Sequence, residues 1–174
     1  STSSISLKMK ERGGGINSIT LVDKSSEYNN YYQLSISFNT IDSMGANYIN
    51  SCLEIITKKM IEEIESSNDL TEQEKEINII MSILSNSTPN CIVEAKAECK
   101  IDEIGNINGL NANKFIEKYS HAIEISKIDL GRAVTNNKGI MNGIDSVLIA
   151  TGNDFRAVEA AVHSYACKDG KYKG

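Results

Sequence analysis

The sequence is poor in several residue types that mark specialised folds. Pro89 is its single proline, tryptophan is absent, and only two histidines occur among 174 residues. Its four cysteines stand apart from one another, and none belong to a C-x-x-C pair. These spacings exclude the usual structural zinc patterns, so we expect no metal site and predict that the thiols are free and buried.

Long apolar runs and an excess of positive charge are also missing. No run reaches the length of a membrane span, and the first residues lack the hydrophobic centre of a signal peptide. The net charge of −5 argues against a protein that binds nucleic-acid backbone. With 40% apolar residues the chain should bury a core, and we expect a soluble, cytoplasmic globular protein without nucleic-acid or membrane partners.

The first half contains the clearest strand patterns. Residues 16–22 and 31–38 alternate apolar and polar side chains, and the polar segment between them favours an antiparallel hairpin. A weaker alternation over residues 1–12 predicts a further short strand. The capping pattern Thr71-x-x-Glu74 predicts a helix that runs on to Leu84.

A short glycine-containing segment, residues 42–47, follows the second predicted strand. Asp42 suits the N-cap of a helix whose apolar residues recur at helical spacing from Ile49 to Ile64. The free N–H groups and the positive dipole end of that helix would suit a pyrophosphate. The alternative is an ordinary capped helix with Met44 in the core.

Turn-forming residues around Pro89 predict a boundary between a first domain, residues 1–85, and a second, residues 86–174. In the second domain, residues 91–101 alternate as a strand would. Helical spacing of apolar residues predicts helices over residues 110–128 and 155–167.

Lys138 lies in a stretch rich in glycine and asparagine that predicts a turn, and Arg132 lies in a similar turn just before it. The apolar run over residues 147–150 predicts a short buried strand that would bring Lys138 and Asp154 into one neighbourhood. An ammonium group beside a carboxylate can polarise a carbonyl oxygen and move protons. The alternatives are a plain salt bridge, and Asp154 as the N-cap of the last helix.

Two adjacent stretches carry a specific resemblance. Residues 137–143 read Asn-Lys-Gly-Ile-Met-Asn-Gly, and residues 150–160 read Ala-Thr-Gly-Asn-Asp-Phe-Arg-Ala-Val-Glu-Ala. Both resemble the 3-hydroxy-3-methylglutaryl-CoA reductases, in particular class II. Asp-Ser-Met-Gly-Ala-Asn at residues 42–47, Ala-Lys-Ala-Glu-Cys at 95–99 and Arg-Gly-Gly-Gly at 12–15 are similar to further segments of that family, in its order.

The resemblance implies an α+β fold, with a small ferredoxin-like antiparallel cofactor domain and part of a larger mixed α/β substrate domain. It implies reduction of 3-hydroxy-3-methylglutaryl-CoA to mevalonate and CoA by two molecules of NADPH or NADH, in a homodimer or higher homo-oligomer. Lys138 and Asp154 match the catalytic pair of the family, and Arg132 and Asn142 match positions that hold the acyl group. The matches to cofactor-binding positions are Asp42, Met44, Gly45, Asn47 and Asn86.

The sequence also departs from the family pattern. The catalytic glutamate of the family lies upstream of the matching segments and its catalytic histidine downstream, and neither segment is in this chain. The chain therefore resembles an interior piece that should be inactive by itself. A hypothesis of another class is a non-catalytic module that binds a nucleotide or CoA and uses Lys138 only as a counter-ion.

Overall fold

Strands β1 (Gly15–Asp23) and β2 (Tyr32–Asn39) form an antiparallel hairpin in the computed structural model, which describes residues 4–174. Leu21 pairs with Leu34, and one irregularity of register lies between Ile16 and Ser18. The turn closes where the Lys24 amide donates to the Tyr31 carbonyl at 3.0 Å. The two predicted strands and their antiparallel pairing are confirmed.

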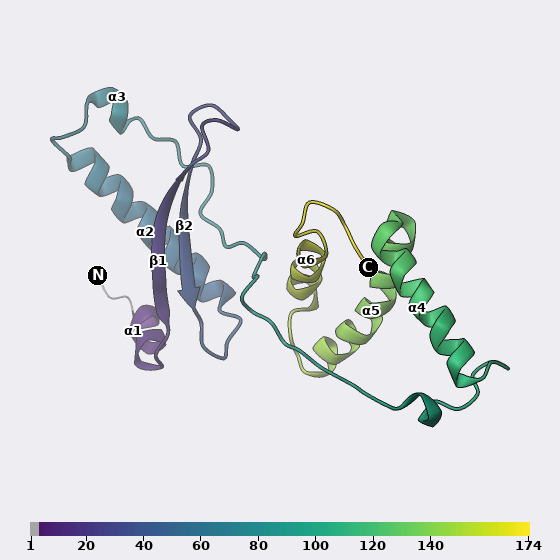
Figure 1. The fold of residues 1–174 in the computed structure, drawn as a ribbon. Coiled ribbons are helices and arrows are strands. Elements are labelled where there is room, and N and C mark those ends of the chain that lie inside the picture. Colours follow the sequence, from purple (N-terminus) through teal and green to yellow (C-terminus); the bar gives the residue numbers. More distant parts are fainter. Residues whose placement is uncertain (1–3) are drawn as a thin grey trace. The chain divides into compact units, whose positions relative to one another are not determined.

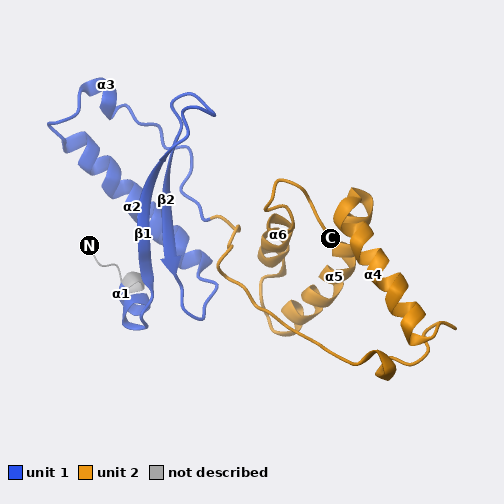
Figure 2. Cartoon of the chain, in the orientation of Figure 1, with its two compact units in different colours: residues 1–84 blue, residues 85–174 orange. Residues whose placement is uncertain are grey.

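The chain divides into two units, residues 1–84 and residues 85–174, and is an α+β protein (Figure 2). In unit 1 the hairpin packs with helices α1 (Ser4–Glu11) and α2 (Ala46–Ser66) (Figure 1). Met9 of α1 and Cys52 of α2 are buried, and the rings of Phe38 and Tyr48 meet edge to face at 6.0 Å. This small core ties both helices to the strands.

The weak strand prediction over residues 1–12 is wrong for the described part, because Ser4–Glu11 is helix α1; residues 1–3 lie outside the described residues. The alternation there was short, and helix formation lets Met9 reach a buried position beside α2 and β1. Tertiary burial therefore decides the conformation of a segment with little local preference.

The predicted helix after Thr71 forms for a single turn only, α3 (Glu72–Lys75), and its extension to Leu84 is wrong. Ile80 and Met81 are each 71% exposed, so a longer helix would have no apolar surface to pack on. The segment is held along α2 instead. There Thr57 and Ser82 share a hydrogen bond of 2.7 Å between their hydroxyls, and the Leu84 amide donates to Asn50 Oδ1 at 3.0 Å.

The capping box at the start of α3 is confirmed and should depend on pH. The Thr71 amide donates to Glu74 Oε2 at 2.9 Å, and this hydrogen bond lowers the pKa of Glu74 below its ordinary 4.5. A lowered pKa means that the stabilisation is present above pH 4.5 and is lost as the pH falls through the lower, folded-state value. An NMR titration of the Thr71 amide should show its shift changing below pH 4.5, and Glu74→Gln should remove that step.

Unit 2 begins irregularly and then becomes helical, with a short 3-10 turn η1 (Ile101–Glu103) followed by α4 (Ala112–Ile128), α5 (Leu130–Ala150) and α6 (Phe155–Ala166) (Figure 1). The helices predicted over residues 110–128 and 155–167 are confirmed. Helix α5 contacts both α4 and α6, and it buries Ala133, Asn137 and Met141 at four-residue spacing. No helix in the described part of the chain is long and apolar enough to cross a membrane.

The turn predicted around Lys138 and the strand predicted over residues 147–150 are both wrong, because both lie in α5. Gly139 and Gly143 made the sequence pattern typical of a turn, although both lie inside the helix. A glycine inside a helix costs only about 1 kcal/mol relative to alanine, and the burial of the three-residue stripe Ala133, Asn137 and Met141 outweighs that cost. Arg132 likewise lies in the first turn of α5 and not in a glycine turn.

The strand predicted over residues 91–101 is also wrong. Residues 91–100 have no regular structure, and Val93 is 96% exposed. A strand needs a neighbour to pair with, and none of the described elements of unit 2 is a strand. The prediction of buried thiols fails for the same reason at Cys91 and Cys99, and Cys167 at the end of α6 is exposed too; only Cys52 is buried.

Candidate cofactor and substrate sites

The candidate cofactor segment of unit 1 leads into the N-terminus of α2. Gly45 is the N-cap residue, and no side chain caps the helix. Asp42 as the N-cap is therefore wrong. Its carboxylate forms an ion pair with the Arg12 guanidinium, because α2 begins one turn later than predicted. Met44 is 53% exposed, which contradicts the alternative that placed it in the core.

Gly45 is fixed by both conformation and space. Its φ is +73°, in the left-handed region, and a Cβ atom there would lie 2.4 Å from Thr40 Cγ2. The turn beneath it is closed twice: Thr40 Oγ1 donates to the Ser43 carbonyl at 2.7 Å, and Ser43 Oγ donates to the Thr40 carbonyl at 2.8 Å. Only glycine lets the chain enter α2 this close to Thr40.

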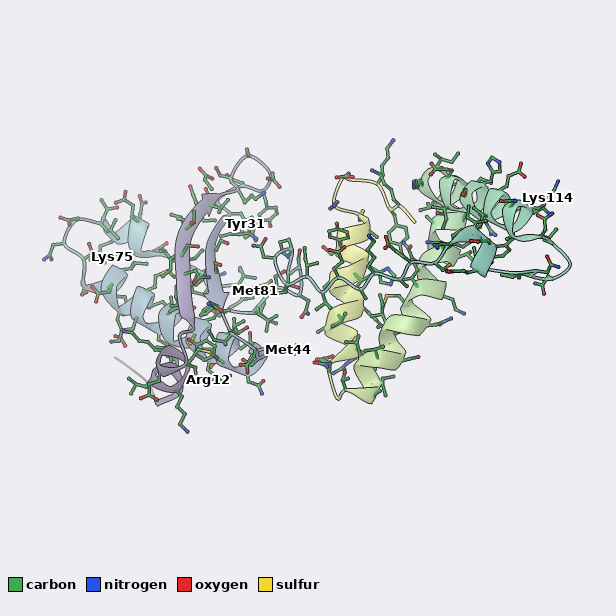
Figure 3. All side chains as sticks on the ribbon, turned by 60° about the horizontal axis from the view of Figure 1, so that its bottom comes forward. Arg12, Tyr31, Met44, Lys75, Met81 and Lys114 are labelled. Atoms are coloured by element: carbon green, nitrogen blue, oxygen red, sulfur yellow. The ribbon has the colours of Figure 1, made fainter. Side chains whose placement is uncertain are left out.

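The start of α2 has the properties of an anion-binding position. Its first N–H groups lack a side-chain cap, Asn47 is exposed in the first turn, and the Arg12 guanidinium lies beside the segment. Figure 3 shows Arg12 and Met44 at the same end of unit 1. Tyr48, next along the helix, is partly buried, and this burial raises the pKa of its phenol. Asn86, the remaining predicted cofactor residue, is exposed in unit 2.

Helix α5 carries three of the predicted substrate and catalytic residues. Lys138 and Asn142 are four residues apart, so they share one face of the helix, and both are exposed. Arg132 lies six residues before Lys138, which turns it about 120° away around the axis. Its amide donates to Asp129 Oδ1, the N-cap of α5, at 2.7 Å. The structure therefore brings together Lys138 and Asn142, but not Arg132.

Asp154 follows the C-terminal end of α5, whereas Lys138 lies near the middle of that helix. The Asn153 amide donates to the Leu148 carbonyl at 2.9 Å, which holds the start of α6 against the last turns of α5. Ten residues separate Lys138 from Leu148, or about 15 Å along the helix axis. No ion pair joins Lys138 to Asp154 in the described part of the chain. The inference that a short strand brings them together within one chain is wrong.

The capping role of Asp154 is confirmed. Its Oδ1 accepts a hydrogen bond of 3.2 Å from the Ala157 amide, and Arg156 Nε lies 3.9 Å from the same oxygen. Asp154 is exposed, so its second oxygen can meet a further group. Capping therefore does not exhaust what this carboxylate can bind.

Sequence reasoning missed one feature beside Lys138. Asn137 is only 7% exposed, and its Nδ2 donates to the Lys173 carbonyl at 2.7 Å. The two residues are 36 positions apart, so no local pattern announces the contact. The one available signal is that Asn137 is polar although it lies between Ala133 and Met141 on the buried face of the helix, where apolar residues are expected.

The fold and these residues place the chain in a class of α+β proteins with candidate ligand residues in two units, and comparison with known proteins names the family. The family model of hydroxymethylglutaryl-coenzyme A reductase matches residues 2–173. The chain belongs to that family.

Relatives and solved structures agree with this assignment. The chain is 34% identical to a probable 3-hydroxy-3-methylglutaryl-coenzyme A reductase of Borreliella burgdorferi, over 94% of this chain and 35% of that protein. It is 37% identical to the enzyme of Archaeoglobus fulgidus, over 74% of this chain and 26% of that one. The class II reductase of Streptococcus pneumoniae, solved bound to NADPH in open conformations, superposes with a TM-score of 0.75 and 30% identity, over 98% of this chain and 42% of that chain. The chain thus spans 35% of the length of the first of these curated relatives and 26% of the second.

Proposed function

We propose that this chain is part of a class II reductase that converts 3-hydroxy-3-methylglutaryl-CoA to mevalonate and CoA. The observation that carries the proposal is the family match over residues 2–173, together with an exposed Lys138 that shares a helix face with Asn142. Unit 1 holds the cofactor, and unit 2 supplies residues to the acyl substrate.

Lys138 polarises the substrate carbonyl group by binding the carbonyl oxygen. The Nζ ammonium donates a hydrogen bond to the thioester oxygen and then to the aldehyde oxygen, and it stabilises the negative charge that develops on each. It is exposed and has no ion partner among the residues that the structure describes, so it is available for this role. The side-chain amide of Asn142, one helical turn further along, orients the same oxygen or the adjacent hydroxyl.

Arg132 binds a different part of the substrate. A guanidinium forms bidentate hydrogen bonds with a carboxylate, and the acyl group ends in one. Because Arg132 points about 120° away from Lys138 around α5, its long side chain has to reach around the helix, or the acyl chain has to curve along it. Its role is to fix the distant end of the acyl group and not to take part in bond making.

Asp154 meets Lys138 between two copies of the chain. Helix α5 separates the two residues within one chain, which supports a second subunit as the source of the carboxylate that tunes this ammonium. An isologous dimer supplies each lysine with the aspartate of its neighbour and produces two equal sites. The carboxylate accepts a hydrogen bond from the ammonium, and thereby keeps it charged and holds it toward the carbonyl oxygen.

The residues at the start of α2 fit a dinucleotide. The uncapped N–H groups suit its diphosphate, and exposed Asn47 and Asp42 offer polar partners to its sugars. When bound, NADPH or NADH supplies hydride to the carbonyl carbon, twice for each thioester. Unit 1 contributes position and charge balance: Arg12 neutralises Asp42 beside the diphosphate.

Gly45→Ala should weaken cofactor binding by about tenfold or more, since the new Cβ would lie 2.4 Å from Thr40 Cγ2 and push the α2 start out of place. We would measure the dissociation constant of NADPH by fluorescence quenching in the complete enzyme. Gly109→Ala is the matched control: Gly109 also has a positive φ, +78°, but no atom lies within 4 Å of its virtual Cβ. If both substitutions weaken NADPH binding equally, backbone strain alone accounts for the loss, and the contact between Gly45 and Thr40 plays no part in cofactor binding.

The proposed reaction has a simple stoichiometric test. The complete enzyme should oxidise two molecules of NADPH or NADH for each 3-hydroxy-3-methylglutaryl-CoA and release one free CoA thiol. A ratio of one, or oxidation without thiol release, would contradict a four-electron reduction. Cofactor binding with no thioester-dependent oxidation would favour the non-catalytic module.

A further inference from the structure

Lys173 and Gly174, two residues of unit 2, form a clasp that is hydrogen-bonded to α4, α5 and α6. The Lys173 amide donates to the Ala166 carbonyl at the end of α6, at 3.0 Å. The Gly174 amide donates to the Ser126 carbonyl of α4, at 3.2 Å. The Lys173 carbonyl accepts from Asn137 Nδ2 of α5, at 2.7 Å. One residue from each of these helices thus forms a hydrogen bond with Lys173 or Gly174.

Asn137 is the only side chain among these contacts, and its surroundings are tight. It is 7% exposed, Ala133 one turn before it is fully buried, and Ser126 of α4 is 3% exposed. Its Oδ1 accepts a hydrogen bond of 3.2 Å from Asn136 Nδ2, so both ends of the amide are used. The bond to Lys173 holds α5 at one rotation and one axial position, because a shift would leave the buried Nδ2 donor unsatisfied, while the bond from Asn136 lies within α5 and moves with it.

The geometry points to Asn137 as the positioning residue for Lys138: through the clasp it fixes the rotation of α5 and so the place of the ammonium group. This inference rests on the proposed function of Lys138. The two residues are neighbours on the helix, one inward and one outward. A lysine Nζ stands roughly 8 Å from the helix axis, so a rotation of about 10° moves it by about 1.5 Å. Misplacement of a catalytic group by about 1 Å can reduce turnover by about 10²-fold.

Asn137→Asp is the sharpest variant, because it keeps the shape of the side chain and replaces the donor by an oxygen that repels the Lys173 carbonyl. In the complete enzyme we expect kcat to fall at least tenfold, with the KM for NADPH changed less than twofold. Met141→Ala is the stability control. Met141 is buried on the same stripe, at 6% exposure, but has no hydrogen bond to the clasp among the described contacts. The substitution should therefore lower Tm and leave kcat within twofold at a temperature where the enzyme is folded.

A second pair of variants tests the clasp without touching α5. Gly174→Ala places a Cβ 2.5 Å from Ser126 Oγ and should move the clasp, with a several-fold fall in kcat. Lys173→Ala removes that side chain and its 2.8 Å ion pair with Asp169 but keeps the accepting carbonyl, so kcat should stay within twofold. This pair decides the matter if Asn137→Asp fails to fold.

Lys138→Ala, measured in the same assay, separates this inference from the function on which it rests. If Lys138→Ala keeps normal turnover, both fall together. If Lys138→Ala loses turnover while Asn137→Asp and Gly174→Ala keep theirs, only the positioning role is overturned. The positioning role is overturned as well if Met141→Ala, with a Tm like that of Asn137→Asp, loses as much kcat as Asn137→Asp, because general destabilisation would then account for the effect.

Discussion

Lys138→Ala should lower kcat of the complete reductase by about 10³-fold, since one preorganised donor to a developing oxyanion is worth about 10² to 10³ in turnover. The KM for NADPH should change less than twofold, because Lys138 is proposed to contact the acyl oxygen and is not among the residues proposed to bind the dinucleotide. Steady-state oxidation of NADPH, followed at saturating thioester, measures both quantities.

The control for this substitution is Lys127→Ala. Lys127 is a lysine of the same unit, near the end of α4, where its ammonium pairs with Glu124 at 2.6 Å. An exposed pair of this kind contributes little, so turnover should stay unchanged. A large rise in the KM for NADPH after Lys138→Ala, with kcat preserved, would mean that the lysine serves binding and not catalysis. That outcome would favour the non-catalytic module.

Asp154→Asn should lower kcat by about 10²-fold or more and leave Tm unchanged. Asparagine caps a helix about as well as aspartate, so the hydrogen bond from the Ala157 amide at the start of α6 survives the change. The negative charge that supports the Lys138 ammonium is lost. Thermal unfolding and kcat, measured on the same preparation, separate the two roles of this one side chain.

Asp154→Ala completes the comparison. It removes both the charge and the cap, and loss of an N-cap costs about 1 kcal/mol, so Tm should fall as well. If Asp154→Asn keeps full turnover and only Asp154→Ala is impaired, the residue is a helix cap and nothing more.

The parts of the fold that could be predicted are those with a local signal. The period-two alternation of residues 16–22 and 31–38 predicts the hairpin, and the side chains of Thr71 and Asp154 announce the starts of α3 and α6. Each of these signals lies within a few residues of the structure it causes.

Helix α5 could not be predicted in the same way. Its buried stripe consists of Ala133, Asn137 and Met141, of which one is small and one is polar, while Gly139 and Gly143 argue for a turn. The helix exists because α4 and α6 cover that stripe and because Lys173 satisfies the buried amide. Such contacts join residues far apart in the chain, and a window of neighbouring residues does not contain them.

The candidate site shows the same division. The motif residues were located by resemblance, and Lys138 and Asn142 do share a face of α5. The expected proximity of Lys138 and Asp154 depended on a strand that the chain does not form, and three turns of helix now separate them. We therefore propose that the pairing forms between two chains and not within one.

Subunit complementation tests that pairing most directly. Lys138→Ala and Asp154→Asn enzymes, each inactive alone, are mixed in equal amounts, dissociated and reassembled. If each site takes its lysine from one subunit and its aspartate from the other, half of the dimers are mixed and each has one intact site, so about a quarter of normal turnover returns. Activity that stays at the level of the separate variants, with mixed dimers demonstrated by affinity tags, would contradict a site shared between subunits.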